Sequence, residues 1–250
     1  GIRDKLVTGV QTCALPISKY EVRAEIRLGP AAEMSLVDRG EQVFYDAKLS
    51  HDGWMSCHSC HSDGHSNGQL NDNFSDGSFG ASKRVLSAMG LEGTSPFAWN
   101  GGTADLTRQI RNSVTRTMQN DEGPSSEQEA SLLAFLHSLP PPPSVDRARG
   151  EVNQEAVQRG QQVFQNLGCV HCHAPPVYTT PETYDVGVED KLGNKQFNPP
   201  SLRGVSQREP LLHDGRAANL RELFVKHRHQ LKKEMAAEEL EPLLQFLRSL

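Results

Sequence analysis

The pattern C-x-x-C-H occurs twice in this sequence, and that repetition restricts the possible folds more than any other feature. The first copy is CHSCH at residues 57–61 and the second is CVHCH at residues 169–173. Each copy follows the same opening, RGEQVF at residues 39–44 and RGQQVF at residues 159–164. A sequence that repeats its motifs in the same order predicts two copies of one structural unit.

Two later pairs of segments continue the repeat. PFAWNGGTADL at residues 96–106 matches PLLHDGRAANL at 210–220, and SLLAFLHSLP at 131–140 matches PLLQFLRSL at 242–250. Apolar residues recur every three or four positions at the start and the end of each copy, which predicts helices there. The stretches between them are rich in Gly, Ser, Asn and Pro, which predicts long irregular loops that wrap a ligand or carry function.

The composition favours a bound cofactor and argues against two other kinds of partner. Only 36% of the residues are hydrophobic, against roughly 45–50% in ordinary soluble domains on a slightly broader count. This favours a large cofactor that supplies part of the core. The net charge of −5 argues against a nucleic-acid surface, since basic residues cluster only between Lys226 and Lys233. No apolar run approaches the ~18 residues of a membrane-spanning helix.

Three kinds of site use a pair of cysteines at this spacing. A redox-active thiol pair is typical of a βαβ unit, and the sequence shows no such unit. A zinc site needs four ligands, and it could draw on His58 and His61, so this alternative stays open. In a haem site both thiols bond to the porphyrin vinyl groups, and the histidine that follows ligates the iron. Two such motifs in a duplicated unit favour the haem interpretation.

This interpretation assigns six residues to two haem c groups. Cys57, Cys60 and His61 are expected to bind the first haem, and Cys169, Cys172 and His173 the second. The neighbouring histidines are expected to be bystanders at the surface or in loops: His51, His58, His65 and His171. Covalent haem attachment takes place outside the cytoplasm, which implies a bacterial periplasmic or otherwise extracytoplasmic protein.

The predicted fold class is mostly α, with two tandem cytochrome c-like domains related by duplication and with long irregular loops. The proline tract at residues 140–144 separates the domains, because four prolines end a helix and form a stiff linker. We expect the first haem domain at residues 36–143 and the second at residues 144–250.

Residues 1–35 are expected to be a remnant outside both domains. The segment GIRDKLVTGVQTCALPIS at residues 1–18 resembles translated sequencing adapter, which would make Cys13 accidental and leave any export signal outside this sequence. In residues 19–30 apolar and charged residues alternate, which predicts a half-buried strand. Because one strand is not stable alone, we interpret it as the tail of a truncated β domain, such as the last strand of a β-propeller.

From about residue 36 to its end, the chain resembles the di-haem cytochrome c peroxidase and MauG superfamily. The resemblance rests on the two C-x-x-C-H motifs, on PFAWNGGTADL, and on NPPSLRGVSQREPLLHDGRAANL at residues 198–220. It implies two c-type haems, the first of which would react with hydrogen peroxide. It also implies a redox protein or a small electron donor as partner.

The resemblance further implies roles for residues outside the motifs. Trp99 takes the place of a tryptophan that lies between the haems, and Gln109 the place of a glutamine in the distal pocket. Met118 lies near the family's distal methionine in the first half. In the second half His227 stands where the family has an axial methionine, with His229 close behind. The second haem is therefore expected to have two histidine ligands.

Several departures from the family bear on the activity. No acid directly precedes Met118, and the loop at residues 72–87 contains no distal histidine, so Met118 could ligate the first iron and close that site. Arg84 stands where the family has an asparagine that helps to bind calcium, which makes a calcium ion doubtful here. In a turn shared with the family, His213 could lie near the second haem and Arg216 could pair with a haem propionate.

Two functions remain open from the sequence. One is a di-haem cytochrome that transfers electrons with both irons six-coordinate. The other is an enzyme of the cytochrome c peroxidase or MauG type that reduces hydrogen peroxide at one open haem. A high-spin ferric signal together with peroxide-dependent oxidation of a reduced cytochrome would favour the enzyme, whereas low-spin haems inert to peroxide would favour the carrier.

Overall fold

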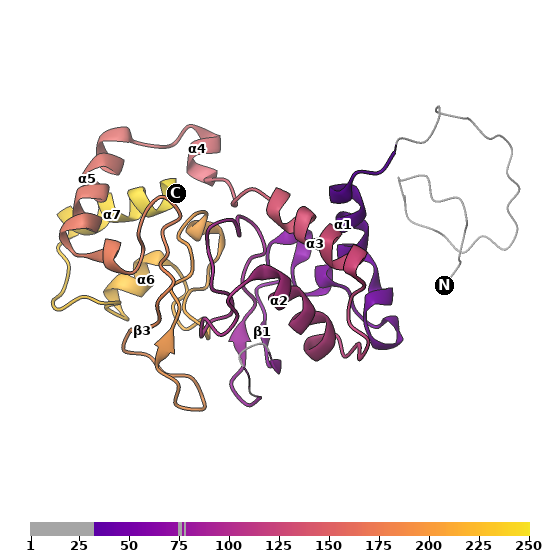
Figure 1. Cartoon of the computed structure of the whole chain (residues 1–250). Coiled ribbons are helices and arrows are strands. Elements are labelled where there is room, and N and C mark those ends of the chain that lie inside the picture. The colour runs from indigo at the N-terminus through magenta and orange to yellow at the C-terminus, as the bar shows by residue number, and fades with distance from the viewer. Residues whose placement is uncertain (1–32, 75–76, 78) are drawn as a thin grey trace, which may run out of the picture. The chain divides into compact units, whose positions relative to one another are not determined.

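Each half of the repeat is built on one pair of packed helices (Figure 1). In the computed structural model, α1 (Leu36–Tyr45) packs on α3 (Ser126–Ser138), and α5 (Gln154–Asn166) packs on α7 (Ala237–Ser249). Both pairs form where the apolar periodicity predicts helices. The fold class is therefore confirmed as mostly α, with only short strands among the described residues.

The structure describes residues 33–74, 77 and 79–250. Within this part of the chain, residues 34–250 form one compact unit. The predicted strand at residues 19–30 and the adapter-like segment before it lie outside the described residues. The expected domain boundary between residues 143 and 144 stays a prediction, and below we use "first half" for residues 34–143 and "second half" for residues 144–250.

Shorter elements fill the space between the helix pairs. The short helices are α2 (Leu106–Asn112), the π-helix η6 (Ser113–Thr117), α4 (Val145–Arg149) and α6 (Leu220–Val225). The 3-10 turns are η1 (Ala47–Leu49), η2 (His51–Gly53), η3 (Cys57–Ser59), η4 (Ser62–Gly64), η7 (Cys169–His171) and η8 (Val205–Gln207). Strand β1 (Leu70–Asn71) pairs antiparallel with β2 (Lys83–Arg84), and β3 (Tyr184–Asp185) with β4 (Gln196–Phe197).

Within each pair the two helices cross closely, and in both pairs this close approach depends on a glycine. A Cβ atom on Gly40 in α1 would lie 1.9 Å from the carbonyl oxygen of Ser131 in α3. A Cβ atom on Gly160 in α5 would lie 2.0 Å from the carbonyl oxygen of Pro242 in α7. These glycines belong to the repeated RGxQVF openings, so the same residue serves the same contact in both halves.

Each half has its own hydrophobic cluster, and each cluster faces a cavity described below. The first cluster is formed by Phe44, Leu49, Ala88, Leu106, Ile110, Val114, Met118, Leu132, Phe135 and Leu136. The second contains Phe164, Leu220, Leu243, Leu244 and Phe246 among its buried residues. An isolated β-bridge recurs beside each cluster, Phe97 with Thr103 and Leu211 with Ala217. The duplication seen in the sequence is thus present in the packing.

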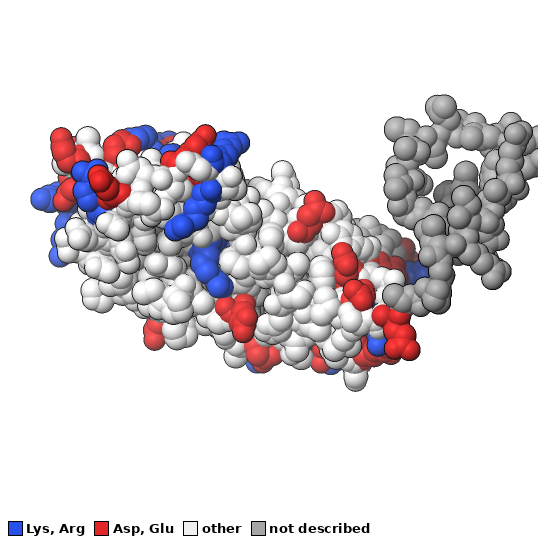
Figure 2. Space-filling view, turned by 90° about the horizontal axis from the view of Figure 1, so that it is seen from above, with Lys and Arg blue, Asp and Glu red and all other residues white. Residues whose placement is uncertain are grey.

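The charges are not distributed evenly over the surface. On the face shown in Figure 2, lysine and arginine side chains gather mostly over the second half, whereas acidic side chains predominate over the first half. None of the helices that the structure describes is long and apolar enough to cross a membrane.

Candidate functional site

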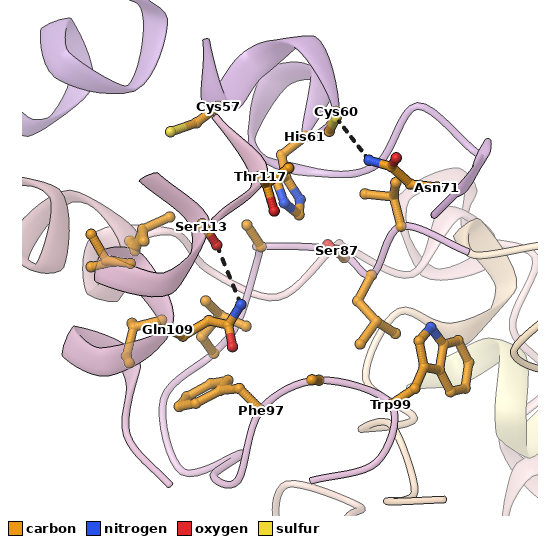
Figure 3. Close-up of a pocket in the computed structure, with 18 of the residues that line it drawn as sticks. Cys57, Cys60, His61, Asn71, Ser87, Phe97, Trp99, Gln109, Ser113 and Thr117 are labelled. Carbon is orange, nitrogen blue, oxygen red and sulfur yellow. Dashed lines mark hydrogen bonds between the residues drawn. The ribbon is translucent and has the colours of Figure 1, made fainter. Parts of the chain in front are cut away.

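The first C-x-x-C-H motif opens on a cavity of about 260 Å³ (Figure 3). Cys57, Cys60 and His61 line one part of its wall, and further residues expected from the sequence line the rest: Trp99, Gln109 and Met118. The motif begins with the turn η3, and the backbone N–H of His61 donates to the carbonyl oxygen of Cys57 at 2.9 Å. The local turn therefore places the two thiols and the imidazole at the same cavity.

The chemistry of this first motif suits attachment to a cofactor better than thiol redox catalysis. Burial raises the pKa of the Cys57 thiol to about 11 and also raises the pKa of the Cys60 thiol. A reactive redox cysteine needs a lowered pKa instead. Burial lowers the pKa of His61, so its imidazole is neutral at pH 7, as a metal ligand must be. Its Nδ1 atom is buried and has no hydrogen-bond partner among the described residues.

The second motif opens on a separate cavity of about 490 Å³, lined by Cys169, Cys172 and His173. The Nδ1 atom of His173 lies 3.1 Å from the carbonyl oxygen of Tyr178. Because a carbonyl oxygen only accepts, Nδ1 carries the proton and the lone pair of Nε2 is left for a metal. Burial lowers the pKa of His173 to about 4. This histidine is thus neutral, oriented and ready to ligate.

Two histidines were candidates for the other side of the second cavity, and the structure separates them. His229 lines the same cavity as His173. His227 does not line the cavity; its Nε2 donates to the carbonyl oxygen of Arg216 at 3.0 Å. His227 stands at the position where the family has an axial ligand, but its ring is hydrogen-bonded to the backbone and does not line the cavity.

Residues of α2 and the π-helix η6 line another part of the wall of the first cavity. Met118 follows η6, is only 3% exposed, and its backbone N–H donates to the carbonyl oxygen of Ser113 at 2.9 Å. A π-helical turn is found frequently at functional sites, and here it ends directly before Met118, which lines the cavity. The Nε2 atom of Gln109 donates to Ser113 Oγ at 3.3 Å, whereas Gln109 Oε1 is buried without a partner among the described residues (Figure 3).

Trp99 stands in the wall shared by the two cavities, since it lines both. Its Nε1 donates to the carbonyl oxygen of Arg84 at 2.8 Å, and its ring meets the ring of His213 edge-on at 6.4 Å between centroids. His213 in turn stacks on Phe197 at 4.5 Å. A continuous aromatic contact thus runs from the first half into the second.

Three other sequence expectations can be compared with the geometry. His65, expected as a bystander in a loop, is half-buried and joins the halves: Nδ1 lies 2.8 Å from Ser87 Oγ, and Nε2 lies 3.0 Å from the carbonyl oxygen of Gln207. Arg216, a candidate for a propionate, is paired with Asp214 at 2.7 Å and lines neither cavity.

The third is Arg84, which the calcium argument singled out. It directs its guanidinium at the carbonyl oxygen of Arg208, at 2.7 Å. Arg208 lines both cavities and was missed, because no sequence pattern marks it.

The residues present fit two haem c groups better than the alternatives. The four cysteines of the motifs are free, so each can bond to a porphyrin. No three His, Cys, Asp or Glu side chains in the described part of the chain are arranged to hold a metal ion, which leaves the zinc alternative without a ligand set.

Comparison with known proteins points in the same direction. Residues 34–141 match a family model described as di-haem cytochrome c peroxidase. The cytochrome c551 peroxidase of Nitrosomonas europaea is 26% identical over 86% of this chain and 79% of its own length. A MauG protein of Methylophilus methylotrophus is 23% identical over 80% of this chain and 76% of its own length.

Solved structures share the fold. A chain from the hydrazine synthase of Kuenenia stuttgartiensis matches 93% of this chain and 100% of its own, with a TM-score of 0.78 and 22% identity. A diheme peroxidase of Burkholderia thailandensis matches 86% of this chain and 85% of its own, with a TM-score of 0.60 and 16% identity. At these identities the matches establish the fold alone.

Proposed function

Because the chain belongs to the di-haem cytochrome c peroxidase and MauG superfamily, we propose that it binds two c-type haems and transfers electrons between them and a redox partner. The observation that carries the proposal is the pair of C-x-x-C-H turns, each placing a neutral imidazole at its own cavity. The two cavities share a wall that contains Trp99. A bound haem c supplies a reversible one-electron couple at its iron.

The residues of the chain have distinct tasks in this proposal. The thiols of Cys57, Cys60, Cys169 and Cys172 hold the two porphyrins through thioether bonds. His61 and His173 would ligate the two irons. As further ligands we assign Met118, which lines the first cavity, and, in place of His227, His229, which lines the second. Trp99 lines both cavities and contacts His213, which lines the second, so the two rings would lie between the two cofactors.

A second function, reduction of hydrogen peroxide at the first haem, is favoured by Gln109. Its Oε1 atom is buried at the first cavity and makes no hydrogen bond with any residue that the structure describes. An unpaired buried acceptor of this kind is costly unless a ligand donates to it, and a bound peroxide would supply an O–H donor. This function requires Met118 to leave the iron accessible.

Location, calcium and further domains are part of the same proposal. Covalent haem attachment implies an extracytoplasmic, bacterial periplasmic protein. We propose that no calcium ion lies between the halves, since the guanidinium of Arg84 donates to the carbonyl oxygen of Arg208 at 2.7 Å in the place where the family pattern has a calcium-binding asparagine. An N-terminal β-propeller and a soluble cytochrome or small electron donor remain proposed partners.

The first test measures haem content. The full chain is produced with an export signal in cells that attach haem c, and the haem per chain is measured after denaturation. We expect two covalent haems, and one in each of the variants Cys57→Ala/Cys60→Ala and Cys169→Ala/Cys172→Ala. Wild-type protein with bound zinc and no covalent haem would contradict the proposal.

The second test separates the two functions. Ferric protein is examined by electron paramagnetic resonance and then mixed with peroxide and a reduced cytochrome. Low-spin signals only, with no oxidation of the cytochrome, support the electron carrier. A high-spin signal with peroxide-dependent oxidation that falls in Gln109→Leu, which removes the proposed hydrogen-bond acceptor, supports the peroxidase. Met118→Ala is the matched variant, since it should create a high-spin signal only if Met118 ligates the iron.

A further inference from the structure

Three arginines lie where the two halves meet, and none of them is paired with a carboxylate. Arg84, Arg203 and Arg208 form no salt bridge with any residue that the structure describes. The Nε atom of each is buried and makes no hydrogen bond within the described part of the chain. Arg84 is only 8% exposed. A buried cation without a counter-ion is strongly unfavourable, so a negatively charged ligand is expected beside those arginines that face a cavity.

The hydrogen bonds of two of these arginines leave the same edge of the guanidinium free. Nη1 of Arg84 donates to the carbonyl oxygen of Arg208 at 2.7 Å, and Nη1 of Arg208 donates to the carbonyl oxygen of Ser201 at 2.7 Å. In both, the Nε–Nη2 edge makes no hydrogen bond with a described residue. That edge presents two parallel N–H donors, the geometry that binds a carboxylate through both oxygens.

Arg203 differs from Arg84 and Arg208 in its hydrogen bonds and in its position. Its Nη2 already donates to the carbonyl oxygens of Gly90 and Glu92, at 2.5 and 3.2 Å. It lines neither cavity, whereas Arg84 and Arg208 line both. Arg203 therefore joins the halves through backbone contacts, and only the other two arginines reach the space in which a cofactor would lie.

The position of Arg84 is set from both halves. Its backbone N–H donates to the carbonyl oxygen of His213 at 2.7 Å, and its own carbonyl oxygen accepts from Trp99 Nε1 at 2.8 Å. The neighbouring cation, Lys83, also lines the first cavity, but it is paired with Asp190 at 2.9 Å. The unbalanced positive charge at the shared wall thus belongs to Arg84 and Arg208.

We propose that Arg84 and Arg208 form a carboxylate-binding site in the wall between the cavities, and that its ligands are haem propionates, one from each haem. This inference rests on the proposed binding of two haems. Each haem c carries two propionate groups, and a propionate from either cavity would balance a buried guanidinium charge. The same two side chains would then orient both cofactors and place positive charge at the wall of both cavities.

The test uses the haem-loaded full chain and the variants Arg84→Gln and Arg208→Gln, with Arg203→Gln as the matched control. Resonance Raman spectra report the bending band of the propionates, which responds to their hydrogen bonds. Redox titration reports the midpoint potential of each haem. We expect both covalent haems to remain in every variant, because the thioether bonds are unchanged.

Arg84→Gln and Arg208→Gln should each shift the propionate band and lower the potentials of both haems. The potentials fall because loss of a nearby cation favours the more positive ferric state. Arg203→Gln should leave both readouts at their wild-type values. Arg84→Lys, which keeps the charge but loses the two-donor edge, should shift the band while the potentials stay closer to wild type.

Several outcomes would overturn the inference. Wild-type protein with two haems, together with Arg84 and Arg208 variants whose propionate band and potentials match those of Arg203→Gln, would show that the arginines only pack. If a Gln variant does not fold, the propionate band is measured in the corresponding Lys variant instead. An unshifted band in that variant would contradict the proposed site. Wild-type protein without covalent haem would instead contradict the proposed function itself.

Discussion

His227 and His229 stand two residues apart, yet only one of them reaches the second cavity. The ring of His227 is held by the carbonyl oxygen of Arg216, whereas His229 faces the same cavity as His173. Burial lowers the pKa of both His173 and His229, so both imidazoles are neutral at pH 7. At the scale of single residues, the proposed ligands of the second haem depend on which histidine of the short segment after α6 lines the second cavity.

This difference predicts opposite results for two alanine variants. His229→Ala should change the ferric signal of the second haem from low-spin to high-spin, because the variant lacks the proposed sixth ligand. His227→Ala should leave the signal of that haem unchanged. Electron paramagnetic resonance and optical spectra of the two purified proteins test this, and the reverse pattern would return the ligand role to His227.

At the scale of elements, the helix pairs α1–α3 and α5–α7 carry the duplication. Each pair crosses where a glycine lets one helix backbone approach a carbonyl oxygen of the other. The rest of each half is mostly irregular, so these two crossings provide most of the regular helix packing. Residues at the crossings are therefore expected to influence stability more than residues in the loops.

Alanine at either crossing should destabilise the protein. In Gly40→Ala and Gly160→Ala the added Cβ would lie within about 2 Å of a backbone oxygen, and overpacking of this kind costs about 1–3 kcal/mol or more. The loss would exceed the gain in helix propensity of about 1 kcal/mol. Denaturant unfolding of the haem-loaded protein measures it.

Exposed positions on the same helices supply the controls for this prediction. Gln42→Ala in α1 and Gln162→Ala in α5 change side chains that face solvent, so their free energies of unfolding should stay within about 0.5 kcal/mol of wild type. Equal stability of the glycine variants and these controls would contradict the close crossing.

At the scale of the whole molecule, buried polar contacts join the two halves. Lys83 from β2 pairs with Asp190 at 2.9 Å, and their side chains are 7% and 5% exposed. Burial alone would raise the pKa of Asp190, but hydrogen bonds from Lys83 and from the backbone N–H groups of Asn194 and Leu192 lower it below 3.8. The stabilisation from the pair is therefore complete above about pH 4 and is lost as the pH falls through the lowered pKa.

Removal of the carboxylate should reveal this contribution. Asp190→Asn removes the carboxylate that pairs with the buried Lys83 at 2.9 Å, and we expect a loss of about 3 kcal/mol in the free energy of unfolding at pH 7. The difference between wild type and variant should shrink as the pH falls below about 4, because wild-type Asp190 then becomes protonated. Denaturant unfolding at several pH values tests this, and a pH-independent difference would argue against the ion pair.

The amino-acid sequence by itself determined the local part of the candidate site. A C-x-x-C-H turn brings its own thiols and imidazole together, because these residues lie within one turn of the backbone, so their proximity depends on no distant packing. The apolar periodicity of the two copies also predicted the helices at the start and the end of each copy, because helical periodicity is a local feature.

Only the tertiary structure decided what faces each motif across its cavity. His229 rather than His227 reaches the second cavity, His65 bridges the halves, and Arg84 meets Arg208 from the other half of the chain. These contacts join residues far apart in the sequence, and their geometry follows from how loops without regular periodicity pack against each other. Side-chain burial and the pairing of charges therefore become visible only once the chain is folded.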